Sequence, residues 1–221
     1  ALSSLDSLRT EFEEDNKRFL PNIDAMRCRI WLRTGEMEKA EQWYRTSATQ
    51  ITPRIRTMWR YQYITRAKVE VALGEENAAL LTLASLIPFC ERCGRVMDRI
   101  YIRILTAVCY QRQNNARWQE EWMQALDAAH EDRFVMPIAQ FGAAVMPMLT
   151  FTGYKKDESF FSLLLQETRR QAVLYPNFLR PMPRLSEPLS PAETQVLRLL
   201  CGNRSNQEIA DILGVKVATV K

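Results

Sequence analysis

The sequence is poor in the side chains that build catalytic and metal-binding sites. It has a single histidine, His130, among 221 residues, and we find no catalytic constellation around it. General acid–base and nucleophilic catalysis depend on such groups in combination, so we expect no catalytic residues and no enzyme activity. The phosphate-binding motif G-x-x-x-x-G-K-[ST] is also absent, so we expect this chain to bind neither ATP nor another cofactor.

Long hydrophobic runs are missing, and cysteines are few. No apolar stretch approaches the roughly 20 residues that span a bilayer, and the first residues lack the pattern of a signal peptide. The odd number of five cysteines fits reduced thiols in the cytoplasm. Cys90 and Cys93 form a C-x-x-C pair, but a structural zinc site usually has more ligands than one such pair supplies. Two small residues on one helix face are the simpler interpretation, so we expect no metal site.

Only seven glycines are present, whereas helix-favouring residues such as Leu, Ala, Arg, Glu and Gln are plentiful. Three of the glycines and one asparagine recur at spacings of 39, 40 and 39 residues: Gly35, Gly74, Asn114 and Gly153. Each follows one amphipathic stretch and precedes another. Because Gly and Asn tolerate the positive φ angles found just past a helix end, we predict the turn of a helix hairpin at each position.

The residues around these turns predict antiparallel helix hairpins. The arrangement of Gly35, Ala40 and Tyr44 is similar to the second half of a tetratricopeptide repeat (TPR), where a small residue lets two helices approach. Further helices are predicted over residues 2–19, 54–73, 97–112 and 155–175. The predicted fold class is all-α, with a TPR-like superhelix over residues 1–175.

The composition changes after Tyr175, where prolines become dense. Pro176, Pro181, Pro183 and Pro188 cannot continue a helix. Residues 176–188 are therefore predicted to form an extended, fairly stiff linker between two domains.

Two short capped helices are predicted after the linker. Ser190 with Glu193, and Ser205 with Glu208, form the capping-box pattern of a helix N-terminus. Gly214 ends the second helix, and a third helix begins soon afterwards. Two short helices, a tight turn and a new helix predict a helix-turn-helix.

This C-terminal segment resembles the DNA-binding domain of LuxR/NarL-type regulators. The similarity runs from Leu189 to Lys221 through L-S-P-x-E-x-x-V-L-R-L-L, S-N-x-E-I-A-x-x-L and T-V-K, and covers roughly half of that domain. Lys216 departs from the family, which usually has a capping Ser or Thr there. We therefore predict a partial, truncated helix-turn-helix over residues 189–221. The alternative interpretation is an unrelated C-terminal helical hairpin.

A second segment resembles the large ATP-dependent, MalT-like members of the LuxR family. Residues 125–142 are similar to their segment A-L-x-x-A-x-x-x-G-[FY]-x-x-x-F-x-x-x-G, with Asp132 or Arg133 near the usual Gly. The resemblance implies a self-associating transcription activator with an ATP-binding domain, a helical-repeat sensor for a small inducer such as a sugar, and a reader of promoter DNA. Because the chain starts without Met and has no ATP motif, we expect it to be the C-terminal fragment of such a protein.

The residues predicted to contact DNA lie on the second and third helices of this segment. Ser205 and Asn206 are predicted to lie beside phosphates, whereas Thr219 and Lys221 belong to the recognition helix.

Aromatic residues beside arginines in the repeat region suggest a place for the effector, because they can stack on and hydrogen-bond a sugar. Most aromatic residues at helical spacing belong to hairpin cores. Tyr61 and Arg103 lie off the most apolar face of their helices, and we predict that they bind the effector. The alternative function is a helical-repeat scaffold for a protein partner, with DNA binding secondary. A scaffold needs an open groove, whereas a small inducer needs an enclosed pocket.

Overall fold

A computed structural model describes residues 2–15, 17–48, 57–152, 154, 156–180, 191–201 and 204–220. Within these ranges every regular element is a helix, which confirms the predicted all-α class. The chain forms two compact units, residues 1–182 and 183–221, which we call the repeat unit and the C-terminal unit. None of the helices in the described ranges is long and apolar enough to cross a membrane.

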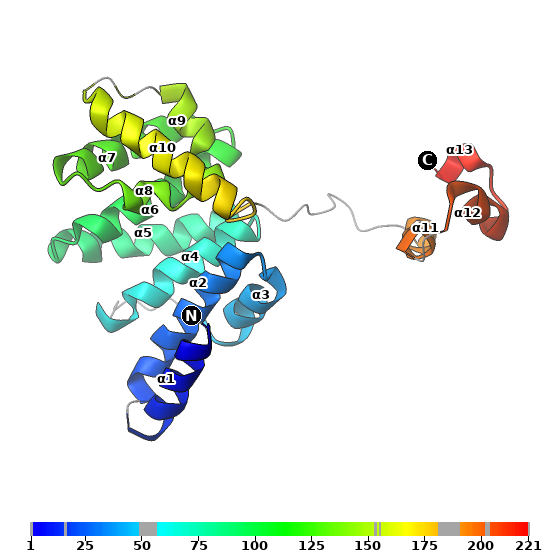
Figure 1. The fold of residues 1–221 in the computed structure, drawn as a ribbon, viewed down its shortest axis with the longest axis horizontal. Coiled ribbons are helices and arrows are strands. Elements are labelled where there is room, and N and C mark those ends of the chain that lie inside the picture. The colour runs from blue at the N-terminus through cyan, green and yellow to red at the C-terminus, as the bar shows by residue number, and fades with distance from the viewer. Residues whose placement is uncertain are drawn as a thin grey trace. The chain divides into compact units, whose positions relative to one another are not determined.

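The repeat unit consists of antiparallel helices that pack against their neighbours in sequence. Its elements are α1 (Leu2–Asp15), η1 (Lys17–Phe19), α2 (Leu20–Thr34), α3 (Met37–Thr46), η2 (Thr57–Trp59), α4 (Arg60–Ala72), α5 (Glu76–Arg92), α6 (Val96–Arg112), α7 (Trp118–Glu131), α8 (Met136–Ala139), η3 (Gly142–Ala144), α9 (Met146–Thr152) and α10 (Glu158–Leu174). Helices α2 and α3, α4 and α5, and α6 and α7 form three successive hairpins. Figure 1 shows α5, α6 and α7 stacked on one another, as in a TPR-like superhelix.

Three of the predicted hairpin turns are confirmed by their backbone angles. Gly35, Gly74 and Asn114 have φ angles of 83°, 71° and 54°. The backbone N–H of Gly35 also caps α2 by donating to the carbonyl of Trp31. The fourth predicted turn residue, Gly153, lies outside the described residues.

Two further turns with positive φ, which the repeat spacing did not reveal, join one hairpin to the next. Gly94 separates α5 from α6 with φ 58°, and Arg133 separates α7 from α8 with φ 56°. Arg133 occupies the neighbourhood in which the MalT-like segment usually has Gly. The left-handed backbone there gives a physical reason for that glycine, because side chains with a Cβ are strained in this region.

The fourth repeat departs from a simple hairpin. The segment before α10 is divided into α8, η3 and α9, and Pro137 and Pro147 lie in the first turns of α8 and α9. Proline fits a first turn because it lacks only an N–H that has no helical partner there. Between them, Gly142 has φ 49° and packs directly on α10, where an added Cβ would lie 3.0 Å from the backbone nitrogen of Ala172.

The core extends past the end of α10. Phe178 and Leu179 are buried, with 3% and 0% of their surface exposed. Arg112 holds this segment in place: one of its NH groups donates to the carbonyl of Leu179 and the other to the carbonyl of Val71, at 2.7 Å for the latter. The repeat unit therefore continues past the predicted boundary at Tyr175, and residues 176–180, predicted as linker, are packed against it.

Candidate DNA-binding unit and effector pocket

The C-terminal unit contains three short helices, α11 (Pro191–Cys201), α12 (Asn206–Leu213) and α13 (Val217–Val220). The predicted capping box at the start of α12 is confirmed. The Ser205 hydroxyl accepts from the Glu208 N–H at 3.3 Å, and the Glu208 carboxylate accepts from the Ser205 N–H at 2.8 Å. The Ser205 N–H and, at 2.9 Å, the Ser205 hydroxyl both donate to this carboxylate and lower the pKa of Glu208 below its ordinary value. The other predicted capping box, at Ser190, lies outside the described residues.

A tight turn joins α12 to α13. Gly214 adopts a left-handed conformation with φ 65°, and the Val215 N–H donates to the Ala210 carbonyl at 3.0 Å. Ile209 and Ala210 are buried on the inner face of α12, with 0% and 2% exposed. This arrangement is the geometry of a helix-turn-helix, in which the last helix presents side chains to the major groove.

The residues predicted to contact DNA lie at the start of α12 and on α13. Ser205 is exposed, but its hydroxyl already serves as the cap of α12. Asn206 is the first residue of α12, and Thr219 lies on α13; both are exposed. Lys221 lies outside the described residues. DNA contact by these four residues stays a prediction.

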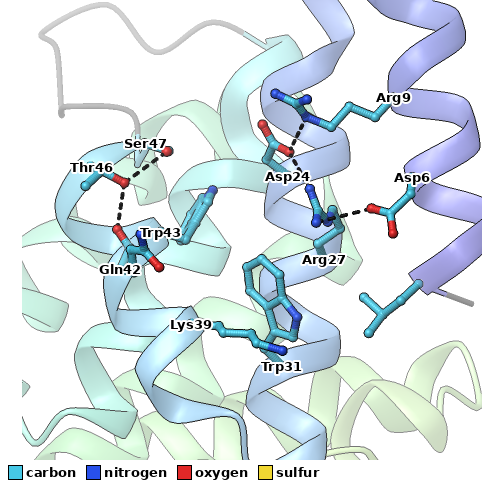
Figure 2. A pocket seen from close by; sticks show the side chains of 11 residues that line it. Asp6, Arg9, Asp24, Arg27, Trp31, Lys39, Gln42, Trp43, Thr46 and Ser47 are labelled. Atoms are coloured by element: carbon cyan, nitrogen blue, oxygen red, sulfur yellow. Dashed lines mark hydrogen bonds and ion pairs between the residues drawn. The ribbon is translucent and has the colours of Figure 1, made fainter.

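A pocket lies between α1, α2 and α3, and we call it the three-helix pocket (Figure 2). Its volume is about 520 Å³, enough for a small organic molecule. Two indole rings, Trp31 from α2 and Trp43 from α3, form part of its wall.

Planar charged groups form another part of the same wall. The Arg27 guanidinium lies 3.2 Å from the Asp6 carboxylate and 3.6 Å from that of Asp24, and it is 5.3 Å from the centre of the Trp31 ring. Nε of Arg27 and Nε1 of Trp43 are buried and have no hydrogen-bond partner among the residues that the structure describes. Alternating charges and aromatic faces suit a neutral ligand with several hydroxyl groups.

The two residues predicted to bind the effector lie elsewhere in the repeat unit. Tyr61, on α4, lies under Arg29, whose guanidinium carbon is 3.6 Å from the centre of the tyrosine ring. Arg103, on α6, forms an ion pair with Glu121 of α7 at 2.8 Å. Neither residue lines the three-helix pocket, and effector binding by these two residues stays a prediction.

Sequence reasoning missed the three-helix pocket, although one signal for it was present. Asp24, Arg27 and Trp31 are spaced by three and four residues, so they share one face of α2. What the sequence did not reveal is that α1 and α3 close around that face.

The C-x-x-C pair has the surroundings of ordinary helix residues. Burial raises the pKa of the Cys90 thiol to about 11, so the thiolate that binds metals is disfavoured. Cys93 is exposed at the end of α5. Within the described ranges, no group of three or more His, Cys, Asp or Glu side chains is placed to hold a metal ion.

A stack of helix hairpins together with a capped helix-turn-helix defines the class: a helical-repeat protein that carries a DNA-binding unit. Comparison with protein families agrees and is more specific. The family described as the MalT-like TPR region matches residues 2–155, and the chain belongs to this family. The family of bacterial regulatory proteins, luxR family, matches residues 187–221.

No curated protein and no solved structure matches the chain. The two family matches confirm the predicted MalT-like, LuxR-type regulator. The chain is a DNA-binding transcription regulator, and the predicted partner class, promoter DNA, follows from its luxR-family unit.

Proposed function

We propose that the repeat unit is the receptor for a small, hydroxyl-rich effector such as a sugar. The effector binds in the three-helix pocket and controls how the helix-turn-helix binds promoter DNA. In this proposal the ligand is the inducer of a self-associating transcription activator. Any ATP-dependent step is carried by a domain outside these 221 residues.

The observation that carries the proposal is the combination of two indole rings, Trp31 and Trp43, with paired charged groups in one pocket wall. Indole rings offer apolar faces to the C–H groups of a sugar, and the charged groups of Asp6, Asp24 and Arg27 can hydrogen-bond its hydroxyl groups.

The charges of the pocket also favour a neutral ligand over an ionic one. Arg27 is paired with Asp6 and Asp24, and Arg9 lies 3.2 Å from Asp24. The pocket therefore offers both donors and acceptors at fixed positions, without a large uncompensated charge. A polyhydroxyl compound can use both kinds of group.

A thermal-shift screen of the full chain tests the proposal. Glucose, maltose and trehalose would be compared with glycerol at the same concentration, as a control for non-specific stabilisation. A ligand that binds only the folded protein raises Tm, by an amount that grows with its concentration above Kd. We expect at least one sugar to raise Tm beyond the effect of glycerol.

Two matched variants identify the site. Trp43→Phe replaces one indole ring of the pocket wall by a smaller ring, whereas Trp122→Phe makes the same change at a buried tryptophan on α7, outside the pocket. We expect Trp43→Phe to weaken sugar binding at least several-fold and Trp122→Phe to leave it unchanged. If both variants bind like the wild type, or if no sugar binds, the proposal is wrong and the scaffold alternative gains support.

A further inference from the structure

A second cavity in the repeat unit has an unusual charge balance. It has a volume of about 230 Å³ and is lined by residues of α2, α4 and the segments that follow α8 and α10. Three of its eight lining residues are basic, Arg29, Arg33 and Lys68, and none is acidic. We call it the Lys68 cavity; it shares no lining residue with the three-helix pocket.

Lys68 is the most unusual of the three cations. Only 2% of its surface is exposed, and its ammonium nitrogen lies 5.0 Å from the ring centre of Phe141, 5.4 Å from that of Tyr101 and 5.9 Å from that of Phe178. Within the described part of the chain, no carboxylate forms an ion pair with it. Burial lowers the pKa of Lys68 well below 10.5, and the nearby positive charges of Arg29 and Arg33 lower it further. A buried ammonium with aromatic neighbours alone is costly to maintain, so the position calls for a compensating negative charge.

The two arginines contact only neutral groups in the hydrogen bonds and ring contacts of the described residues. Arg29 donates to the Thr65 hydroxyl at 2.7 Å and to the Tyr61 carbonyl at 3.1 Å. Arg33 donates to the Gln140 side-chain carbonyl at 3.4 Å, and it lies 5.1 Å from the ring centre of Tyr175. These contacts fix the directions of both guanidinium groups without neutralising them. The charge of Asp98 acts on Arg29 from a distance, but Asp98 is paired with Arg60 and Arg95 and does not line the cavity. The cavity is therefore preorganised around positive charge that no carboxylate of its own wall compensates.

The apolar part of the wall restricts the size and kind of anion. Met26 and Ile30 of α2 line the cavity beside the ring of Phe178. These side chains offer contact to carbon atoms, which a bare inorganic ion lacks. A volume of about 230 Å³ suits a compact metabolite rather than a polymer or a protein segment.

We propose that the Lys68 cavity binds a small organic anion, with its carboxylate or phosphate group against Lys68, Arg29 and Arg33 and its carbon skeleton against Met26, Ile30 and Phe178. Charge-assisted hydrogen bonds from the guanidinium groups and the ammonium group hold the oxyanion. The Lys68 cavity is separate from the three-helix pocket, so the anion proposal and the sugar proposal can fail independently.

The test is equilibrium binding to the full chain, by calorimetry and thermal shift at constant ionic strength. Sodium benzoate, sodium succinate, glucose 6-phosphate and inorganic phosphate would be compared with sodium chloride. We expect at least one organic anion to bind measurably and to raise Tm. Binding of benzoate or succinate would indicate a carboxylate head group, and binding of glucose 6-phosphate a phosphate head group. If no organic anion exceeds sodium chloride, or if inorganic phosphate alone binds, the proposal is overturned.

Variants separate a binding role of Lys68 from a structural one. Lys68→Met is expected to lower the affinity for the organic anion at least tenfold and to leave the Tm of the unliganded protein equal or higher, because it removes a buried, unpaired charge. Arg33→Gln, at a half-buried position, is expected to weaken binding as well and covers the case in which Lys68→Met does not fold. Arg170→Gln, with a side chain 70% exposed on α10, is the control and should bind like the wild type. Equal affinity in the wild type, Lys68→Met and Arg33→Gln would contradict the proposal.

Discussion

The ammonium group of Lys68 lies 5.0 Å from the centre of the Phe141 ring, in the interior of the repeat unit. The titratable and charged groups around it are Tyr61, Tyr101, Arg29 and Arg33. Because this environment lowers the pKa of Lys68 in the folded state, the unfolded chain binds more protons in the interval between that lowered pKa and 10.5.

The first prediction is therefore that Lys68 contributes more to the stability of the unliganded protein as pH rises through this interval, whereas the buried Cys90 thiol, whose pKa is raised from 9.0, acts in the opposite direction above that value. The contribution of Lys68 is at most about 1.4 kcal/mol per pH unit, the value for one proton. Lys68→Met should remove this contribution, whereas Lys17→Met, at an exposed position, should retain it. Urea unfolding at several pH values measures the effect, and parallel pH profiles of wild type and Lys68→Met would contradict it.

The second prediction concerns the packing of Gly142 on α10. An added Cβ would lie 3.0 Å from the Ala172 nitrogen, and φ is 49°. Gly142→Ala should therefore lower the free energy of unfolding by about 2–4 kcal/mol, the sum of backbone strain and a steric conflict. Gly94→Ala is the control, because Gly94 also has positive φ but no atom within 4 Å of the added Cβ. It should cost only about 1 kcal/mol. Denaturant unfolding measures both losses. Equal losses of unfolding free energy in Gly142→Ala and Gly94→Ala would contradict a steric conflict between residue 142 and α10.

The third prediction concerns the cap of α12. Ser205→Ala removes the hydroxyl that accepts from the Glu208 N–H and should destabilise α12 by about 1 kcal/mol. Ser205→Thr keeps the acceptor and should be close to wild type. Hydrogen exchange of the α12 amides is the suitable measurement, because global unfolding reports mainly on the larger repeat unit.

The same cap should respond to acid. The folded-state pKa of Glu208 is lowered, so its stabilisation of α12 is complete above the ordinary value of 4.5 and decreases as pH falls through the lowered pKa. The effect of Ser205→Ala on α12 exchange should therefore become smaller in acid. An effect that does not change with pH would indicate that the Glu208 carboxylate takes no part in the cap.

The fourth prediction concerns DNA contact. It is measured in a protein whose LuxR-type domain has the length that is usual in that family. Thr219→Ala, Asn206→Ala and Lys221→Ala should each weaken binding to a promoter duplex, and Lys221→Ala should also reduce the salt dependence if it contacts a phosphate. Gln195→Ala, an exposed change on α11, is the control. A residue whose replacement leaves the affinity unchanged is not a DNA contact.

The sequence predicted those features that depend on local backbone chemistry. The turns at Gly35, Gly74 and Asn114 and the cap at Ser205 were all recognised, because positive φ and capping are properties of single residues and their close neighbours. The turn at Arg133 gave no such signal, because arginine, unlike glycine and asparagine, has no preference for positive φ. The turn at Gly94 lies outside the forty-residue spacing of the other turns.

The two ligand cavities could not be predicted, because both depend on side chains that are distant in sequence. Arg29 and Lys68 lie on α2 and α4, and Phe178 lies beyond α10. Only the packing of these elements brings them to one cavity. The sequence around Lys68 gives no sign of a buried cation, because Arg66 and Glu70 on the same helix are also charged.

The most direct test of the central claim, that a ligand of the repeat unit regulates DNA binding, is a fluorescence anisotropy titration of a labelled promoter duplex with and without the sugar selected by the thermal-shift screen. The regulator would carry its full-length LuxR-type domain. We predict that a saturating concentration of the sugar changes Kd for the duplex by about tenfold, which corresponds to about 1.4 kcal/mol of coupling, and that Trp43→Phe abolishes the change at the same sugar concentration while Trp122→Phe retains it. Identical Kd values for the wild type in the presence and absence of bound sugar would contradict the account.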